Sequence, residues 1–98
     1  DSLRKLDQFI AENFKITFGN RIMKQISDFV PVYVASGRSE IEGLDYMVTH
    51  KILRKFESLN LPFLQDELDE LLIVLDRLFG KGQFKFSIKY INELKKQI

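Results

Sequence analysis

The sequence predicts an all-α protein, an irregular bundle of about five helices. Three observations lead to this prediction. Apolar residues recur at three- and four-residue steps in five segments of the chain, as in helices that bury one side. Short connectors containing Gly, Ser, Asn or Pro separate these segments. No two segments pair convincingly as strands, although alternation near 15–18 and 83–86 allows one short extended segment pair.

The first helix is expected from Ser2 to about Phe14, and Ser2 is a suitable N-cap for it. Its buried side is predicted from apolar residues at helical spacing, namely Leu3, Leu6, Phe9 and Ile10. Residues 15–19 then alternate polar and apolar side chains and end in a glycine. This pattern indicates an extended connector that redirects the chain.

The second helix is expected to start at Asn20, which places Arg21 in its first turn. Its apolar stripe is broad enough to contact several neighbours and comprises Ile22, Ile26, Phe29, Val30, Tyr33 and Val34. Pro31 lies within this segment, and a proline removes one helical hydrogen bond and crowds the preceding turn. We therefore expect a kink near Asp28, or a helix that stops and restarts.

The third helix is predicted by Ser39 and Glu42, which have the S-x-x-E spacing of a capping box. Turn-forming residues at 58–62 are expected to end it. Its apolar side follows Ile41, Leu44, Met47, Val48, Ile52, Leu53 and Phe56.

The fourth helix has the clearest pattern, with a leucine-rich side from Leu64 to Phe79 and a closing Gly80-Lys81-Gly82 segment. The acidic residues at 66–70 are spread around this helix, so we expect a solvated surface and not a divalent-ion site. Ser87 is expected to cap the last helix, after the alternating residues near 83–86.

The composition indicates a single helical domain over residues 1–98, because 98 residues suffice for one modest core. A net charge of +1, from 15 Lys and Arg against 14 Asp and Glu, gives no overall field toward nucleic acid or an acidic membrane. The absence of cysteine and of a long apolar run favours a cytoplasmic protein with no membrane partner. The chain starts within a predicted helix and without an initiator methionine, so we expect a fragment of a longer protein.

The sequence contains no catalytic constellation. It lacks the G-x-x-x-x-G-K-[ST] phosphate loop, the G-x-S-x-G motif and the second histidine or cysteine that a zinc site needs. His50 is therefore expected to be a surface or boundary side chain. The isolated chain is not expected to be an enzyme.

Arg21 is the main candidate for ligand binding. The start of a helix has free N–H groups and the positive end of the dipole, and a guanidinium adds donors that match phosphate. A second candidate is the set Lys51, Arg54 and Lys55, named the basic cluster below, near the end of the third helix. Cations there stabilise the helix by about 0.3–1 kcal/mol, and contact with a phosphate or an acidic neighbour is the functional alternative.

Three short motifs precede the leucine-rich helix and the final helix: Phe18-Gly19-Asn20-Arg21, Gly43-Leu44-Asp45-Tyr46-Met47 and Lys51-Ile52-Leu53-Arg54-Lys55. In this order, from about residue 15 onward, the chain resembles the C-terminal helical lid of an AAA+ ATPase. More narrowly, it is similar to the McrB-like branch, the nucleotide-driven motor subunits of 5-methylcytosine-specific restriction systems. The Pro31 region and the Gly80-Lys81-Gly82 loop do not match the family.

The resemblance implies that Arg21 is the sensor-two arginine, which reaches from the lid to the terminal phosphates of the nucleotide. It implies ATP or GTP with Mg as cofactors of a parent ATPase or GTPase, with the N-terminal nucleotide-binding core as the first partner. Neighbouring subunits of a homo-oligomeric ring, a nuclease subunit and DNA are further implied partners. Asp45, Lys51 and Arg54 match the branch's pattern, which implies a structural or a subunit-interface part for them. With Lys55, they are the candidates for an interface or phosphate contact.

Two other functions stay open from the sequence. A stand-alone helical protein–protein interaction module would dock a partner through an exposed apolar patch around Phe84, Phe86 and Val32. A helical DNA-binding domain would use the basic cluster, and its affinity would fall steeply with salt.

Overall fold

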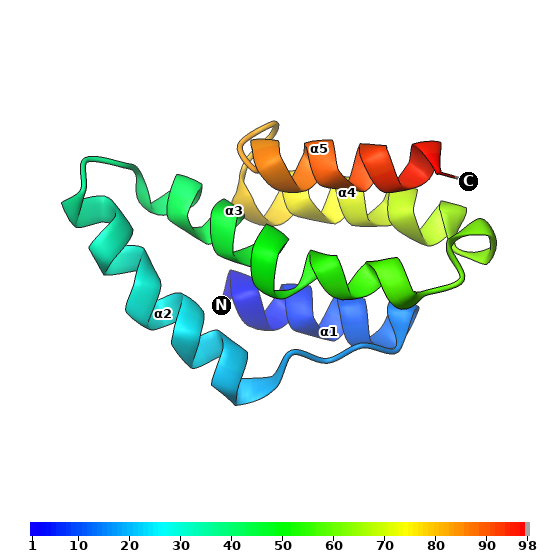
Figure 1. The fold of residues 1–98 in the computed structure, drawn as a ribbon, viewed down its shortest axis with the longest axis horizontal. Helices are drawn as coiled ribbons and strands as arrows, with labels where there is room; N and C mark the ends of the chain where they lie inside the picture. Colours follow the sequence, from blue (N-terminus) through cyan, green and yellow to red (C-terminus); the bar gives the residue numbers. More distant parts are fainter. Residues whose placement is uncertain (98) are drawn as a thin grey trace.

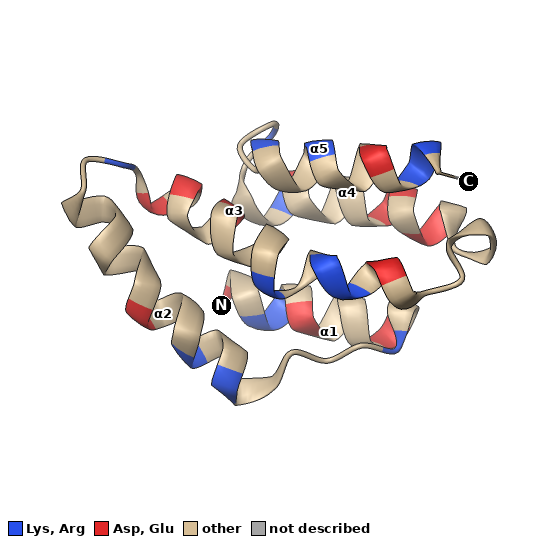
Figure 2. Cartoon of the chain, viewed as in Figure 1, with Lys and Arg blue, Asp and Glu red and all other residues tan. Residues whose placement is uncertain are grey.

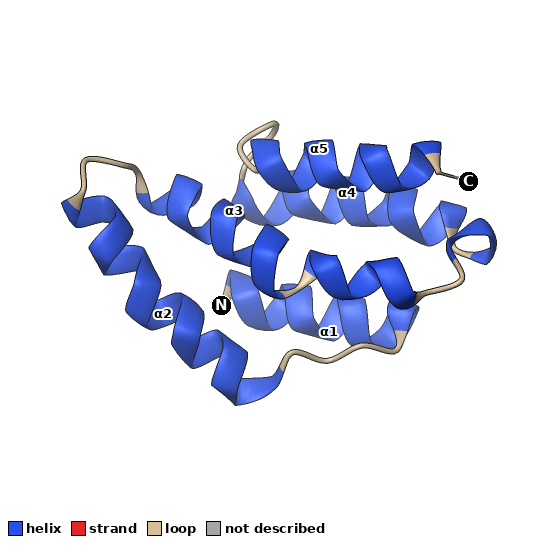
Figure 3. Cartoon of the chain, in the orientation of Figure 1, coloured by secondary structure: helices blue, strands red, loops and turns tan. Residues whose placement is uncertain are grey.

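Residues 1–97, which the computed structural model describes, form five α-helices and two short 3-10 helices, with no strand among them (Figure 3). The α-helices are α1 (Ser2–Phe14), α2 (Gly19–Ala35), α3 (Glu40–Lys51), α4 (Gln65–Phe79) and α5 (Lys85–Lys96), and the 3-10 helices are η1 (Leu53–Ser58) and η2 (Leu61–Phe63). The all-α prediction is therefore confirmed.

The helices pack pairwise into a bundle in which α1 lies on α4, α4 on α5, and α5 on α3 and η1. Figure 1 shows α1, α4 and α5 running along the long axis of the molecule, with α2 slanting away from them. The main packing partner of α2 is α3. A force on α2 would therefore reach the rest of the bundle chiefly through α3.

One hydrophobic core joins these elements. Its completely buried apolar side chains are Leu6, Ile10, Ile26, Val48, Ile52, Leu53, Phe56, Leu68, Leu71, Leu75, Phe84 and Ile91. Two aromatic pairs lie within it: the rings of Phe14 and Phe56 are 4.5 Å apart, and those of Phe79 and Phe84 are stacked at 4.0 Å. The second pair fixes the start of α5 against the end of α4.

The close approach of α2 to α3 depends on a glycine. A Cβ atom added at Gly43 would lie 3.4 Å from the Cβ and Cδ2 atoms of Tyr33, so a larger residue would press on that ring. Tyr46 of α3 fills the adjoining space, with its ring 5.8 Å from Phe29 and 5.9 Å from Tyr33. This aromatic seam holds α2 against α3.

The capping residues predicted for α3 are confirmed, whereas the cap predicted for α1 is wrong. The Ser39 hydroxyl accepts the N–H of Glu42 at 3.1 Å, and the Glu42 carboxylate accepts the N–H of Ser39 at 3.0 Å, which completes the predicted capping box. In α1 the cap is Asp1, whose carboxylate accepts the N–H of Leu3 at 3.2 Å. The Ser2 hydroxyl, the expected cap, instead donates to the Leu78 carbonyl at 3.3 Å and so links α1 to the end of α4.

Pro31 does not interrupt α2, so of the two expected alternatives, a kink near Asp28 or a stop and restart, the second is ruled out. The helix is continuous from Gly19 to Ala35 with the proline inside it. The carbonyl that loses its hydrogen-bond partner belongs to Ser27, and both Ser27 and Pro31 lie on the exposed side. Water can satisfy that carbonyl, so the proline costs less here than it would in the buried stripe.

The third helix ends earlier than its apolar pattern predicts. Regular α-helix stops at Lys51, and the chain continues as the 3-10 helix η1. Residues three apart lie on the same side of a 3-10 helix, which keeps both Leu53 and Phe56 buried. The apolar pattern was therefore right about burial and wrong about the type of helix.

The last helix begins at Lys85, two residues before the predicted cap Ser87, which is buried inside α5. Phe86 is helical as well, and residues 15–18 form a connector, so the extended segment pair predicted for 15–18 and 83–86 is not formed. The turn before α5 contains Gly80 with φ +105°, a conformation that a side chain disfavours. Because this turn is compact, α5 can already begin at Lys85.

We predict that Phe84→Ala lowers the free energy of unfolding by about 3–5 kcal/mol, because it leaves a cavity beside Phe79. Phe86→Ala is the matched control, since this neighbouring phenylalanine is 55% exposed, and its effect should stay within about 1 kcal/mol. Urea unfolding followed by circular dichroism measures both values. Equal losses in the two variants would contradict the packing described here.

Candidate functional site

The start of α2 has no side-chain cap of its own. Its N-cap is Phe18, no side chain caps the first turn, and no acidic residue lies in that turn. The Phe18 ring is buried. The backbone N–H of Phe18 donates to the Asp7 carboxylate at 3.3 Å, which fixes the chain where it enters the helix. The Asp7 carboxylate therefore lies at the positive end of the α2 dipole, while Asn20 and Arg21 of the first turn are exposed.

Arg21 lies in this first turn, as the sequence predicted, and its side chain is exposed. It forms no ion pair among residues 1–97, whereas Lys24, about one turn further on, pairs with Asp28 at 3.0 Å. Arg21 lines none of the three cavities considered below. The structure thus places its guanidinium on an open surface, with its donors available to an external group.

The basic cluster is also exposed, at the end of α3 and in η1 (Figure 2). The cluster has an acidic neighbour, Glu57 of η1. Its carboxylate accepts a hydrogen bond from the Tyr90 hydroxyl of α5. Burial, with the Glu57 carboxylate beside it, raises the pKa of Tyr90 to about 12, and the nearby Arg54 lowers it in part. The cluster is therefore a surface of mixed charge.

Asp45 is separated from the other predicted site residues. It is only 2% exposed and lies between α3 and the start of α5. Its Oδ2 accepts the N–H of Phe86 and its Oδ1 accepts the N–H of Ser87, both at 2.8 Å. Both oxygens already serve α5, so Asp45 has a structural part within this chain, which is one of the two parts that the resemblance implies.

The role of Asp45 is that of an N-cap supplied by another helix. Phe84, the residue in the cap position of α5, forms no side-chain cap, so the first N–H groups of α5 need an outside acceptor. The negative charge of Asp45 also interacts favourably with the positive end of the α5 dipole. This pairing compensates a buried charge that forms no ion pair among residues 1–97.

Two hydroxyl groups complete this polar joint. The Thr49 hydroxyl lies 2.9 Å from the Asp45 carbonyl oxygen and 2.9 Å from the Ser87 hydroxyl, which in turn is 3.4 Å from the same carbonyl. All three residues are buried. One signal in the sequence could have revealed them, because Asp45 falls on the apolar stripe of α3 between Ile41 and Val48.

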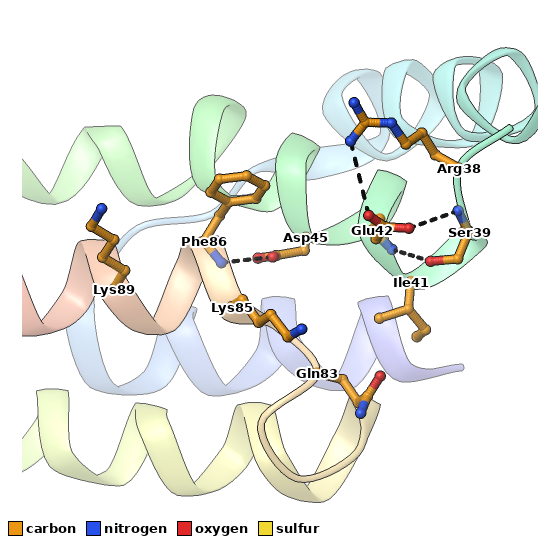
Figure 4. Close-up of a pocket in the computed structure, with 9 residues that line it drawn as sticks. All are labelled: Arg38, Ser39, Ile41, Glu42, Asp45, Gln83, Lys85, Phe86 and Lys89. Atoms are coloured by element: carbon orange, nitrogen blue, oxygen red, sulfur yellow. Dashed lines mark hydrogen bonds and ion pairs between the residues drawn. The ribbon is translucent and has the colours of Figure 1, made fainter. Parts of the chain in front are cut away.

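A cavity of about 560 Å³ opens beside this joint, between the start of α3 and the start of α5 (Figure 4). Its lining comprises Arg38, Ser39, Ile41, Glu42, Asp45, Gln83, Lys85, Phe86 and Lys89. In Figure 4 the Lys85 side chain extends across the hollow toward Gln83 and Ile41, and the Phe86 ring stands near Asp45. The cavity therefore combines apolar surface with cationic side chains and with the carboxylates of Glu42 and Asp45.

Two more cavities adjoin the same elements. One of about 250 Å³ is lined by Thr49, His50, Phe86, Lys89, Tyr90 and Glu93, and so shares Phe86 and Lys89 with the larger cavity. Another of about 390 Å³ lies between the starts of α1 and α3 and the end of α4. His50 is exposed as expected, with its ring 4.2 Å from that of Tyr46. Within residues 1–97 no group of three or more His, Cys, Asp or Glu side chains could hold a metal ion.

No known protein family, curated protein or solved structure matches this chain. None of the helices in the described range is long and apolar enough to cross a membrane.

We predict that Asp45→Ala lowers the free energy of unfolding by about 2–4 kcal/mol, because two N–H groups of α5 lose a charged acceptor. Asp45→Asn keeps the shape but offers only one acceptor oxygen, so a smaller loss is expected. Asp28→Asn, an exposed acid on α2, is the control and should change stability by less than about 0.5 kcal/mol. Chemical unfolding measures the three values, and a neutral Asp45→Ala would refute the capping role.

A second prediction concerns Glu42, whose pKa lies below its usual value of 4.5. The Ser39 backbone N–H and then its hydroxyl lower this pKa, with Arg38 and Lys85 contributing positive charge and desolvation opposing them. The contribution of this carboxylate to stability should therefore be present above pH 4.5 and be lost as the pH falls through the lowered pKa. A carboxyl titration by NMR should give a midpoint below 4.5 that rises in Ser39→Ala and not in Ser58→Ala.

Proposed function

We propose that this chain is the C-terminal lid of an AAA+ NTPase motor of the McrB-like type, acting in a DNA restriction system. In this proposal Arg21 contacts the terminal phosphates of ATP or GTP bound with Mg to an N-terminal core of the same protein. The observation that carries the proposal is the position of Arg21, exposed and without an ion pair among residues 1–97, in the first turn of an uncapped helix.

The chemistry of this helix start suits a terminal phosphate. Free N–H groups and the dipole attract an anion, and the guanidinium can give two parallel hydrogen bonds to phosphate oxygens. Since Arg21 lines none of the three cavities, its ligand would lie between this surface and another part of the protein. A cleft between a lid and a nucleotide-binding core meets that requirement.

A phosphate that is present before hydrolysis and absent afterwards would make the position of the lid depend on the nucleotide state. The packing supplies a route for this change, because α2 lies on α3 and the Asp45 joint ties α3 to α5. In a homo-oligomeric ring, the movement would be passed to neighbouring subunits and then to a nuclease partner or DNA. Lys51, Arg54 and Lys55 remain candidates for such contacts, since all three are exposed.

The two other functions predicted from the sequence differ in their support. Phe84 is buried against Phe79, so it cannot belong to the docking patch once expected around Phe84, Phe86 and Val32. Phe86 and Val32 are exposed. A DNA-binding role of the basic cluster stays a prediction, with Glu57 as a neighbouring charge that opposes it.

The test is Arg21→Ala in the full-length protein. We predict that nucleotide hydrolysis falls by about 100-fold or more, because a donor to the developing phosphate charge is lost, while the circular dichroism spectrum is unchanged. Arg21→Lys should recover only part of the rate, since lysine lacks the planar fork of donors. Lys24→Ala, an exposed cation on the same helix, is the control and should hydrolyse normally. Unchanged hydrolysis in Arg21→Ala would remove the assignment.

A further inference from the structure

The outer side of α5 carries a patch of two cations around an aromatic ring, formed by Lys85, Phe86 and Lys89 and named the α5 patch here. Lys85 and Lys89 are exposed, about one helical turn apart, and without ion pairs among residues 1–97. Phe86 is 55% exposed. The cavities of about 560 and 250 Å³ both include Phe86 and Lys89 in their lining, so hollows adjoin the patch.

The outer side of α4 carries the opposite charge. Asp66, Glu70 and Ile73, named the α4 stripe here, recur at helical spacing and are all exposed. Neither carboxylate has an ion pair within the described residues, and Ile73 is 57% exposed. Asp69 of the same helix, by contrast, pairs with Lys95 of α5. The α4 stripe is therefore an unpartnered acidic surface with an apolar end.

The two surfaces match in spacing as well as in charge. Asp66 and Glu70 are four residues apart, and so are Lys85 and Lys89, which is about 6 Å along a helix axis in both cases. If two such helices lie antiparallel, Glu70 meets Lys85 while Asp66 meets Lys89. Ile73 comes three residues after Glu70, so in this alignment it lies nearly one turn beyond Lys85. At that level Ile41 and Gln83 form the wall of the larger cavity.

We propose that the α4 stripe of one copy of this chain docks on the α5 patch of a second copy. Each molecule carries both surfaces exposed, so each can receive one neighbour and offer its other surface to the next. Such a heterologous contact produces a ring if the rotation closes and an open chain if it does not. The proposal requires neither a nucleotide nor Arg21, so it stands or falls separately from the lid function.

A second copy fits this surface better than a nucleic acid does. Glu42 lies in the wall of the larger cavity and Glu93 in that of the smaller one, so a uniformly charged phosphate backbone would meet two carboxylates. The α4 stripe has only two charges, and both coincide with lysines in the antiparallel alignment. The small number of contacts predicts weak association, with a Kd on the order of 0.1–1 mM.

The test uses two charge-reversed variants, Lys85→Glu/Lys89→Glu and Asp66→Lys/Glu70→Lys. In sedimentation equilibrium at low salt, the average mass of the wild-type chain should rise as its concentration approaches about 1 mM. Each variant alone should remain monomeric, because its two surfaces then carry the same charge. An equimolar mixture should associate again, because the unchanged α4 stripe of the first variant meets the unchanged α5 patch of the second.

Two apolar substitutions and a control complete the experiment. Phe86→Ser and Ile73→Ser should each weaken wild-type association at least about fivefold, whereas Val32→Ser, an exposed residue outside both surfaces, should leave it unchanged. Circular dichroism confirms that each variant is folded. A wild-type chain that stays monomeric at about 1 mM would overturn the proposal, as would a mixture of the two charge-reversed variants that fails to associate. A monomeric chain whose NMR signals at residues 85–89 shift with single-stranded oligothymidine would also overturn it and assign the patch to a polyanion.

Discussion

The hydrogen bonds from Phe86 and Ser87 to the Asp45 carboxylate set the relation between α3 and α5. The two oxygens accept two successive N–H groups at the same distance, so α5 has one axial position relative to α3 in which both bonds form. The buried charge forms no ion pair in the described chain and is compensated by the N–H groups and dipole of α5. A hydroxyl pair, Thr49 and Ser87, satisfies the remaining polar atoms around it.

Several surface features follow from this joint. With α5 fixed in this position, Phe84 points into the core while Phe86 stands outside, and the cavity opens between α5 and the capping box of α3. The joint also makes α3 and α5 a connected unit to which α2 is attached by its aromatic seam. The helix that carries Arg21 is therefore joined to α5 through α3.

Some helix ends were predicted from the sequence, and the start of α5 was not. The capping box of α3 and the glycine turn after α4 were predicted because each is a local signal within one helical turn. The start of α5 was misplaced because its cap comes from Asp45, about 40 residues earlier in the chain. Ser87 has the chemistry of a cap, yet it serves as a buried hydroxyl inside the helix. Local preference could not decide between these two roles.

By itself, the sequence determined the five amphipathic helices, the start of α3 and the placement of Arg21 in a first helical turn, because periodicity and capping act over a few residues. Only the tertiary structure decided that Phe84 is core and Phe86 is surface, that Asp45 caps α5, and that Pro31 lies on the exposed side of a continuous helix. Each of these outcomes depends on which side of one helix faces another. That choice arises from packing between distant segments, which no short stretch of sequence specifies.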